Sequence, residues 1–304
     1  MADLKRGRRP RLDRRKWKEY LFCYTMLLFA FYNIVSYLII NLDSVLLAFT
    51  IRDRNGSEVF SLNNWRLLFQ ELSSRDSTIW NALINTLKYF ALGIVSLLLA
   101  FVVSYFLFRK IWGYKFFRTV FFLPSMISPV VLVLIFKDII KVYGILWYSV
   151  EQTFGIQLGN LLADPRTATG VILFYTFWSG FGANMLLQIG AMNRIPQDIF
   201  EAGKLDGCSS FHEFIYLVVP MCWETLSTQL LLATTGIFTA SGPILYFTNG
   251  DYNTNTLSFW IFNQVLGGAY NYPTTVGLFF TLLAVPIVLL VQYLSKKVNQ
   301  DAQY

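Results

Sequence analysis

The stretch RIPQDIFEAGKLDGCSSFHEFIYLVVP, residues 194–220, is the longest polar segment in the C-terminal half of an otherwise apolar chain. Its residues predict two short helices joined by a corner. Pro196 suits the first turn of a helix, where its missing N–H needs no partner. The dipeptide Asp206-Gly207 tolerates positive φ and predicts the end of the first helix. Ser210 and Glu213 have the spacing of a capping box, which predicts that a second helix begins there.

Apolar side chains lie on both predicted helices, although the segment is too short to form a core of its own. One interpretation is that these side chains fit into the groove of a partner protein, and the other is that the segment is a connector lying on the membrane surface. The apolar positions are Ile195, Ile199, Phe200, Leu205, Phe211, Phe214 and Ile215.

The same segment resembles the EAA loop of ABC-transporter permease subunits, whose pattern is Glu-Ala-Ala, three residues, Gly, nine residues, Ile-x-Leu-Pro. This chain has Glu201-Ala202-Gly203, then Gly207, then Leu217-Val218-Val219-Pro220, with matching spacing throughout. It departs from the pattern at Gly203, which replaces an Ala, and keeps apolar residues at 217 and 219. The dipeptides at 195–196 and 206–207 are similar to those of the carbohydrate-uptake branch, which includes the maltose permease subunits.

The resemblance extends from about Leu21 to Lys297 and implies that the loop couples this chain to a separate ATPase subunit. Gly207 would set the corner, and Glu201 would be the polar contact to the ATPase. The residues implied in coupling are Ile199, Phe200, Glu201, Ala202, Leu205, Asp206, Gly207 and Phe211.

The composition independently indicates a membrane protein. The chain has 304 residues, of which 55% are hydrophobic and 17% aromatic, and its mean hydropathy is +0.48. A membrane-spanning helix needs about 20 mostly apolar residues. We therefore expect an all-α polytopic protein with six spans and a two-helix cytoplasmic loop. The expected spans are Leu21–Leu42, Ile79–Phe108, Thr119–Ile140, Ala168–Met192, Ile215–Thr239 and Pro273–Leu294.

Charge predicts the orientation of the spans. The first eighteen residues contain nine Lys and Arg, which favours a cytoplasmic N-terminus. Six spans place the C-terminus on the same side. We therefore expect a basic tail over 1–20, a permease domain over 21–297 and a short tail over 298–304. The location implied by charge and resemblance is a bacterial plasma membrane.

Several other functional classes are disfavoured by the sequence. The net charge of +7 comes mostly from the basic tail, which suits anionic lipid headgroups and requires no nucleic acid. Three cysteines within or beside the expected spans predict no structural disulfide. The chain has no Walker A sequence, and we expect no catalytic site, no metal and no bound cofactor. ATP and Mg²⁺ would belong to the partner ATPase.

Polar residues inside the spans are candidates for the substrate path. Asn184 and Gln188 are one turn apart and, with Trp178, suit a sugar, since amides bind hydroxyls and indole stacks on a sugar ring. The alternative is hydrogen bonding between helices, which explains the same amides. Glu224, with Thr228 one turn later, is an acid near the cytoplasmic end of a span and has either a functional or a structural role.

Other positions permit two interpretations. Asn81 and Asn85 are either contacts between helices or part of the path. Pro124 and Pro129 predict either a broken helix beside the path or a kinked packing helix. The stretch around Trp65 is either an interfacial helix or a docking surface for a binding protein. Leu257–Leu266 is too short to span and is expected as a partly inserted or surface helix on the outer side.

These observations predict the transmembrane subunit of an ATP-driven sugar importer, with oligosaccharide as the expected substrate. The resemblance implies a second homologous permease subunit, two ABC ATPase subunits and an extracytoplasmic sugar-binding protein as partners. The alternatives are an ATP-independent secondary transporter or channel, and a scaffold subunit. A secondary transporter would carry ionisable residues within the membrane and paired broken helices in two repeats, which this sequence lacks.

Overall fold

A computed structural model describes residues 14–52, 57–155 and 159–301, and residues 1–13 of the basic tail predicted over 1–20 lie outside it. The described part is almost entirely helical, as expected. A two-stranded antiparallel hairpin is the exception, formed by β1 (Thr50–Arg52) and β2 (Glu58–Phe60) with Ile51 opposite Val59.

Four helices are long and apolar enough to cross a membrane. They are α1 (Arg14–Leu47), α3 (Thr78–Phe108), α7 (Ala168–Met192) and α14 (Asn271–Asp301). Two bent helix pairs raise the number of spans to six if each pair is counted as one span. The prediction of an all-α polytopic protein is therefore confirmed.

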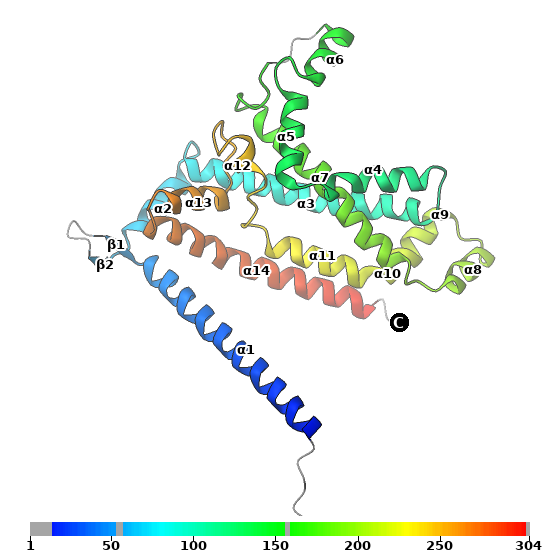
Figure 1. The fold of residues 1–304 in the computed structure, drawn as a ribbon, viewed down its shortest axis with the longest axis horizontal. Helices are drawn as coiled ribbons and strands as arrows, with labels where there is room; N and C mark the ends of the chain where they lie inside the picture. The colour runs from blue at the N-terminus through cyan, green and yellow to red at the C-terminus, as the bar shows by residue number, and fades with distance from the viewer. Residues whose placement is uncertain (1–13, 53–56, 156–158, 302–304) are drawn as a thin grey trace, which may run out of the picture.

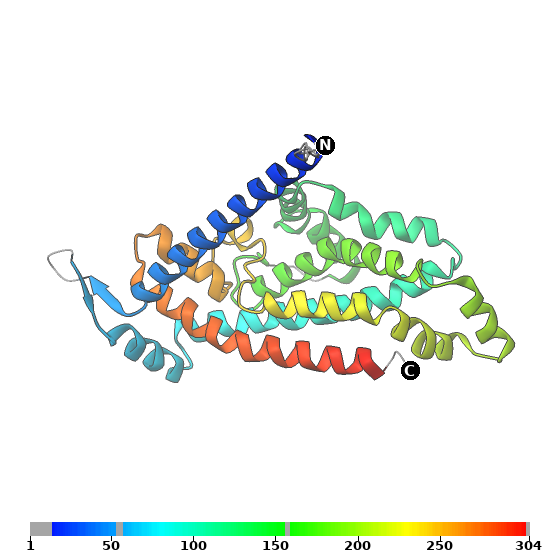
Figure 2. The ribbon, with the colours of Figure 1, turned by 90° about the horizontal axis from the view of Figure 1, so that it is seen from below.

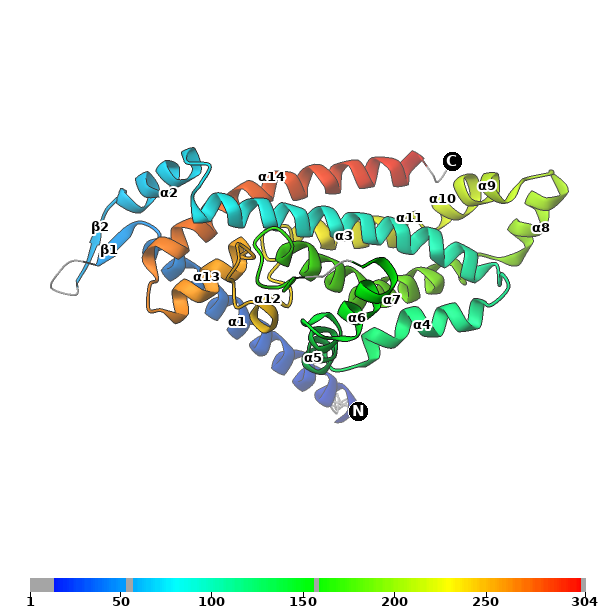
Figure 3. The same ribbon diagram turned by 90° about the horizontal axis from the view of Figure 1, so that it is seen from above.

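The helices α3 and α7 lie side by side at the centre of the bundle (Figures 1 and 3). Small residues allow this close approach, as is usual between membrane helices. Ala100 and Ser104 of α3 are fully buried, and the Ser104 hydroxyl donates a hydrogen bond to Met185 O of α7 at 3.0 Å. Because α3 and α7 are the most extensively packed pair, they form the rigid frame of the fold.

The span expected over Thr119–Ile140 is broken. Helix α4 (Tyr114–Met126) packs along α7, and α5 (Pro129–Ile140) then leaves at 107° and leads into α6 (Ile145–Phe154), as Figure 1 shows. The break occurs because Pro129 has no N–H and disfavours a helical conformation at Ser128. The break agrees with the broken-helix alternative for Pro124 and Pro129 and not with a kinked helix that continues over Thr119–Ile140.

The fifth expected span is also discontinuous. It consists of α9 (Ser210–His212), a π-helix η1 (Glu213–Val218), α10 (Val219–Met221) and, after a 69° bend, α11 (Trp223–Thr235). Pro220 cannot donate to the carbonyl four residues before it, which disrupts the α-helical hydrogen bonding at this point. The chain therefore bends just after the polar segment ends at Pro220.

The elements far from residues 194–220 form the opposite end of the bundle, which contains the hairpin, α2 (Asn63–Ser73), α12 (Ile244–Phe247) and α13 (Leu257–Leu266). Asn85 Nδ2 donates to Asn253 O and Asn255 O at 2.6 and 3.0 Å, so this side chain connects α3 to the loop before α13. Helix α13 has the predicted bounds, but its Leu257, Phe259 and Trp260 are buried, so it is more firmly packed than a surface helix.

Helix α1 stands apart from the bundle. Figures 1 and 2 show that it contacts the rest of the chain near its C-terminal end, where it meets α14 and β1. None of the most apolar part of this helix is buried within the chain. An apolar helix with an unoccupied surface along its length requires lipid or another subunit around it.

We predict opposite effects of alanine at two glycines of α7. A Cβ at Gly182 would overlap the backbone of Phe121 on α4, whereas a Cβ at Gly190 meets nothing within 4 Å. Gly182→Ala should therefore destabilise the protein by about 1–3 kcal/mol through overpacking. Gly190→Ala, the matched control, should leave stability unchanged or raise it by up to about 1 kcal/mol through helix propensity. Thermal unfolding in detergent, followed by tryptophan fluorescence, measures both; equal effects would contradict the close contact between α4 and α7.

Candidate coupling site

The polar segment folds into two helices with a glycine corner, as its sequence predicts. Helix α8 (Gln197–Leu205) ends where Gly207 adopts φ +77°. The Gly207 N–H donates to Lys204 O at 3.1 Å, and the Cys208 N–H donates to Gly203 O at 2.9 Å. This pair of bonds is the Schellman arrangement, which requires a left-handed residue at its centre. Glycine is therefore needed at position 207 for conformational reasons.

The cap of the second helix lies one residue earlier than expected. The Ser209 hydroxyl, rather than that of Ser210, accepts a hydrogen bond from the His212 N–H at 3.3 Å. The capping box predicted from Ser210 and Glu213 is therefore wrong. The shift leaves the carboxylate of Glu213 free for contacts outside its own helix.

Glu213 joins the loop to the end of α3. It is 3% exposed, and its Oε1 lies 3.1 Å from the Tyr105 hydroxyl and 3.4 Å from Arg109 Nε. The Tyr105 hydroxyl also lies 2.9 Å from Ser210 O and shares its proton between the two oxygens. A buried carboxylate needs such partners, since an unpaired charge is strongly unfavourable in this environment. Sequence reasoning missed this group because nothing local to Glu213 indicates a partner over 100 residues away.

Aromatic packing beneath the loop reinforces this connection. Phe200 is 6% exposed, with its ring centroid 5.5 Å from that of Phe108. Phe214 lies 5.4 and 5.0 Å from the rings of Phe101 and Tyr105. Phe200 was expected to contact a partner protein, but its ring faces α3, and half-buried Ile199 packs against the same cluster. These side chains hold the loop against the bundle and offer little surface to a partner.

The outward face of the loop carries the remaining predicted residues. Leu205 is 89% exposed and Phe211 is 69% exposed, so both large apolar side chains are available to a partner. Glu201, Ala202 and Asp206 are also exposed. We call Glu201, Ala202, Leu205, Asp206 and Phe211 the outward surface of the loop.

Gly203 has a packing role that the sequence does not reveal. It is buried, and a Cβ at this position would lie 2.9 Å from Leu217 Cδ1. Gly203 and Leu217 both depart from the EAA pattern, and the Leu217 side chain occupies the space that a Cβ at 203 would enter.

The residues predicted for a substrate path are not brought together. Gln188 is buried, and its Nε2 donates to Leu97 O at 3.1 Å and Gln229 Oε1 at 3.0 Å, which joins α7 to α3 and α11. Trp178 packs on Phe136 with ring centroids 6.0 Å apart. These contacts agree with the helix-packing interpretation.

Of the other three path candidates, Asn184 is on α7, whereas Glu224 and Thr228 are one turn apart on α11. Asn184 is half-buried on α7. Glu224 is exposed in the first turn of α11, and the Thr228 hydroxyl donates to its backbone carbonyl at 2.8 Å. Thr228 thus satisfies its hydroxyl locally.

A cavity of about 430 Å³ lies instead beside the break between α4 and α5. Its wall has backbone groups freed by two prolines, together with hydroxyls of α7, and its far side is formed by Gly242, Pro243 and Tyr246. Irregular backbone at membrane depth is tolerated where it lines a cavity. The lining hydroxyl and proline positions are Pro124, Ser125, Pro129, Tyr175, Thr176 and Ser179.

Comparison with known families decides the classification. Residues 93–303 match the family described as the binding-protein-dependent transport system inner membrane component. The chain belongs to this family. The membership predicted from the EAA loop is therefore confirmed, and the match covers the coupling loop and every span from the middle of α3 onward.

Three similar proteins are permeases by name, and the names of two of them refer to sugars. The chain is 34% identical over 182 residues to the probable ABC transporter permease protein YurN of Bacillus subtilis, covering 58% of this chain and 62% of that protein. It is 27% identical over 232 residues to the lactose transport system permease protein LacF of Rhizobium radiobacter, covering 73% and 78%. The multiple sugar-binding transport system permease protein MsmF of Streptococcus mutans is 28% identical over 242 residues, with 78% and 81% covered.

The fold also matches a solved permease. A chain in the crystal structure of a bacterial ABC transporter involved in the import of the acidic polysaccharide alginate has a TM-score of 0.74. The match covers 93% of this chain and 99% of that chain, at 19% identity. The permease fold is therefore shared over nearly the whole chain. These comparisons favour an ABC permease over an ATP-independent transporter or a scaffold.

The described residues contain no group of three or more His, Cys, Asp or Glu side chains that could hold a metal ion. The family description places this chain among the membrane components of a transport system.

We predict that Glu213→Ala loosens the loop from α3. The substitution leaves Arg109 without its carboxylate partner and the Tyr105 hydroxyl with Ser210 O as its remaining acceptor, and should lower stability by about 1–3 kcal/mol. Trypsin cleavage after Lys204 should become faster in detergent, because the second helix loses its connection to the bundle. Asp198→Ala, which removes an exposed acid from α8, is the matched control and should leave cleavage unchanged. Equal cleavage rates in wild type and Glu213→Ala would contradict an anchoring role.

Proposed function

We propose that this chain is the transmembrane subunit of an ATP-driven sugar importer and forms half of a translocation pore. The observation that carries the proposal is the loop at residues 194–220. It is held to α3 on one side and exposes two large apolar side chains, Leu205 and Phe211, on the other. The names of LacF and MsmF support a sugar as the substrate. Because the relatives' names differ in their sugars, they leave the particular sugar open.

The outward surface of the loop fits an ATPase subunit. Exposed apolar side chains on a rigid base are typical of a helix that inserts into a partner's groove. Glu201, which accepts a hydrogen bond from Gln197 Nε2 at 3.0 Å, gives this surface a polar contact at its edge. Two such ATPase subunits would bind the ATP and Mg²⁺, one against each permease subunit.

Helix α1 supports the presence of a second permease subunit. Its side chains are exposed over most of its length, including Phe22, Phe29 and Tyr37 at 62%, 67% and 70%. Lipid alone satisfies such a surface, but α5 also projects from the bundle with exposed Val130, Val131, Leu134 and Ile135. We infer that a homologous subunit packs against these two projecting helices, and that lipid covers the rest.

The connection between the loop and α3 supplies a route for coupling. When the ATPase subunits close on ATP, movement of α8 is transmitted through Glu213 and the aromatic cluster to α3, and from α3 to α7. Reversing a population of inward-facing and outward-facing states requires about 5.5 kcal/mol of differential binding. A loop attached by one flexible segment would move without moving α3, whereas the contact of Glu213 with Arg109 and the packed aromatic rings transmit the movement.

The cavity beside the α4–α5 break is the proposed sugar path. Its hydroxyls, which donate and accept hydrogen bonds, and its backbone carbonyls, which accept them, are suitable partners for sugar hydroxyls. Trp178, Asn184, Glu224 and Thr228 remain proposed contacts that would require the second subunit or another conformational state to bring them to the sugar. Gln188 is assigned to helix packing.

The orientation follows from the position of the loop. Because ATP is in the cytoplasm, an ATPase that binds the loop places the loop on the cytoplasmic side of a bacterial plasma membrane. The C-terminal end of α14 lies at this same end of the bundle (Figures 1 and 2), which supports a cytoplasmic C-terminus. The opposite end, with α2 and the hairpin, would face an extracytoplasmic sugar-binding protein.

Copurification tests the proposal. The tagged chain is extracted in mild detergent from its native membrane, and its partners are identified by mass spectrometry. We expect an ABC ATPase and a second permease subunit. Isolation of the chain alone, with ATP-independent sugar uptake in liposomes, would overturn the assignment.

Two glycine substitutions separate coupling from general strain. Gly207 and Gly268 have φ +77° and +83°, and a Cβ meets nothing within 4 Å at either position. Valine at either should therefore cost a similar amount, of about 1–2 kcal/mol. We predict that Gly207→Val leaves the protein in the membrane but uncouples ATP hydrolysis from uptake, and that Gly268→Val keeps the two coupled. Uptake and ATPase rates in proteoliposomes measure both, and normal coupling in Gly207→Val would refute the role of the corner.

A further inference from the structure

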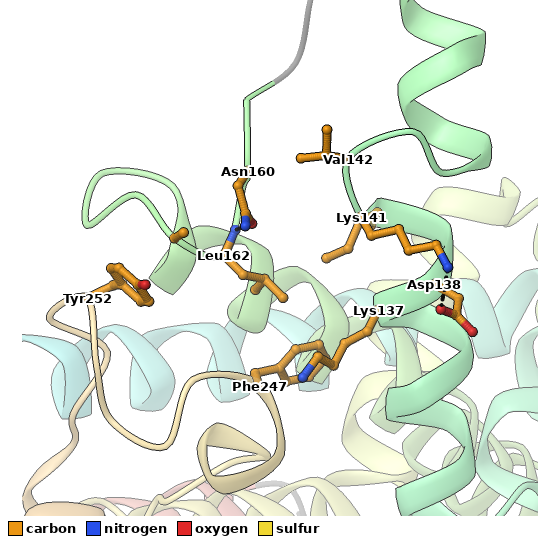
Figure 4. A pocket seen from close by; sticks show the side chains of 10 residues that line it. Lys137, Asp138, Lys141, Val142, Asn160, Leu162, Phe247 and Tyr252 are labelled. Carbon is orange, nitrogen blue, oxygen red and sulfur yellow. Dashed lines mark hydrogen bonds and ion pairs between the residues drawn. The ribbon is translucent and has the colours of Figure 1, made fainter.

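A second cavity, of about 550 Å³, lies on the flank from which α5 projects (Figure 4). Three segments that are distant in sequence form it: the last turns of α5, residues 160–163 before α7, and residues 247–252 after α12. It is separate from the coupling loop and shares no lining residue with the cavity beside the α4–α5 break. Neither the family nor the proposed coupling mechanism accounts for it.

The wall formed by residues 247–252 is rigid. Asn249, Tyr252 and Asn253 have φ between 54° and 58°, a conformation that is uncommon for residues other than glycine. The Thr248 and Thr254 hydroxyls lie 2.6 Å apart and are buried, and Asn253 O accepts the hydrogen bond from Asn85. Strained backbone persists only where surrounding contacts fix it, and it is concentrated at functional sites. The wall is therefore formed before any ligand arrives.

Charge distinguishes this cavity from an ordinary crevice. Lys137 Nζ donates to the neutral carbonyl of Tyr246 at 3.0 Å, and Lys141 Nζ pairs with Asp138 Oδ1 at 2.9 Å. The residues that line the cavity thus carry two ammonium groups and one carboxylate. The Lys141 ammonium is turned toward Asp138 and away from Asn160 and Tyr252, whereas that of Lys137 lies beside Phe247 (Figure 4). Because an ammonium has three protons, Lys137 can bind a further acceptor while keeping its contact with Tyr246 O.

The remaining lining groups suit a sugar ring. Figure 4 shows Asn160 and Tyr252 on the side of the cavity opposite Asp138 and Lys141, with Phe247 below. An amide and a phenol bind hydroxyl groups, and an aromatic ring accommodates the apolar face of a pyranose. A neutral sugar would use these groups but would leave the excess positive charge without a partner.

We propose that this cavity binds a sugar unit that carries a carboxylate, with Lys137 holding the carboxylate. The inference rests on the proposed function, since it specifies the class of sugar that this importer takes. The cavity would select acidic sugars before they reach the path beside the α4–α5 break. Charge-assisted hydrogen bonds are about twice as strong as neutral ones, so Lys137 supplies the selectivity.

The test compares two disaccharides that differ in charge. The chain is purified with its copurifying subunits in lipid nanodiscs, and binding of digalacturonate and of neutral galactobiose is measured by saturation-transfer difference NMR. We expect wild type to bind digalacturonate about tenfold more tightly. Lys137→Met should remove this preference, and Lys137→Arg should retain it because the charge is kept. Lys115→Met, at an exposed position on α4, is the control and should behave as wild type.

Three outcomes would overturn the inference: equal binding of the two disaccharides by wild type, binding of neither, or a preference that survives in Lys137→Met. None of these affects the coupling assignment, because the presence of an ATPase in the same purified sample is scored separately. Absence of the ATPase would instead refute the proposed function. The two failures are therefore distinguishable in one preparation.

Discussion

The contact of Glu213 with Tyr105 and Arg109 is the interaction on which the rest of the account depends. The loop at residues 194–220 is too small to bury a core, so its position is fixed only by what it touches on the bundle. A buried carboxylate between a phenol and a guanidinium fixes one point, and the ring of Phe200 against Phe108 fixes a second. Because these contacts hold the loop against the bundle, its other large apolar side chains, Leu205 and Phe211, face outward.

The positions of the cavities follow from the breaks in the helices. The bends at residues 127–128 and at Cys222 both occur beside prolines, where the helix loses a backbone donor. The first bend turns α5 away from α7 and opens the cavity beside the break. At the tip of α5, the same projection brings Lys137 and Lys141 to the wall formed by residues 247–252. The closely packed pair α3 and α7 thus forms the rigid part of the structure, and the two cavities lie in the irregular backbone around it.

The sequence is informative where the structure is local. The bounds of α7 and α13 agree with prediction because apolar runs with clear ends define them, and Gly207 was identified because a turn dipeptide demands its conformation. Contacts between distant segments could not be predicted from the sequence. Glu213 has the spacing of a cap, and only the fold shows that its partners lie on α3. Likewise, Phe200 and Leu205 are equally apolar in sequence, but one faces α3 and the other faces outward.

The central claim is that the outward surface of the loop contacts an ATPase. Site-specific cross-linking tests it most directly, with Leu205→Cys introduced into a background from which the three native cysteines have been removed. A thiol-reactive cross-linker is applied to native membranes, with Leu62→Cys at the opposite end of the bundle as the control position. The account predicts a covalent product between residue 205 and the ATPase subunit, and none from residue 62. Failure of residue 205 to cross-link, in membranes where the ATPase is present and uptake is intact, would contradict it.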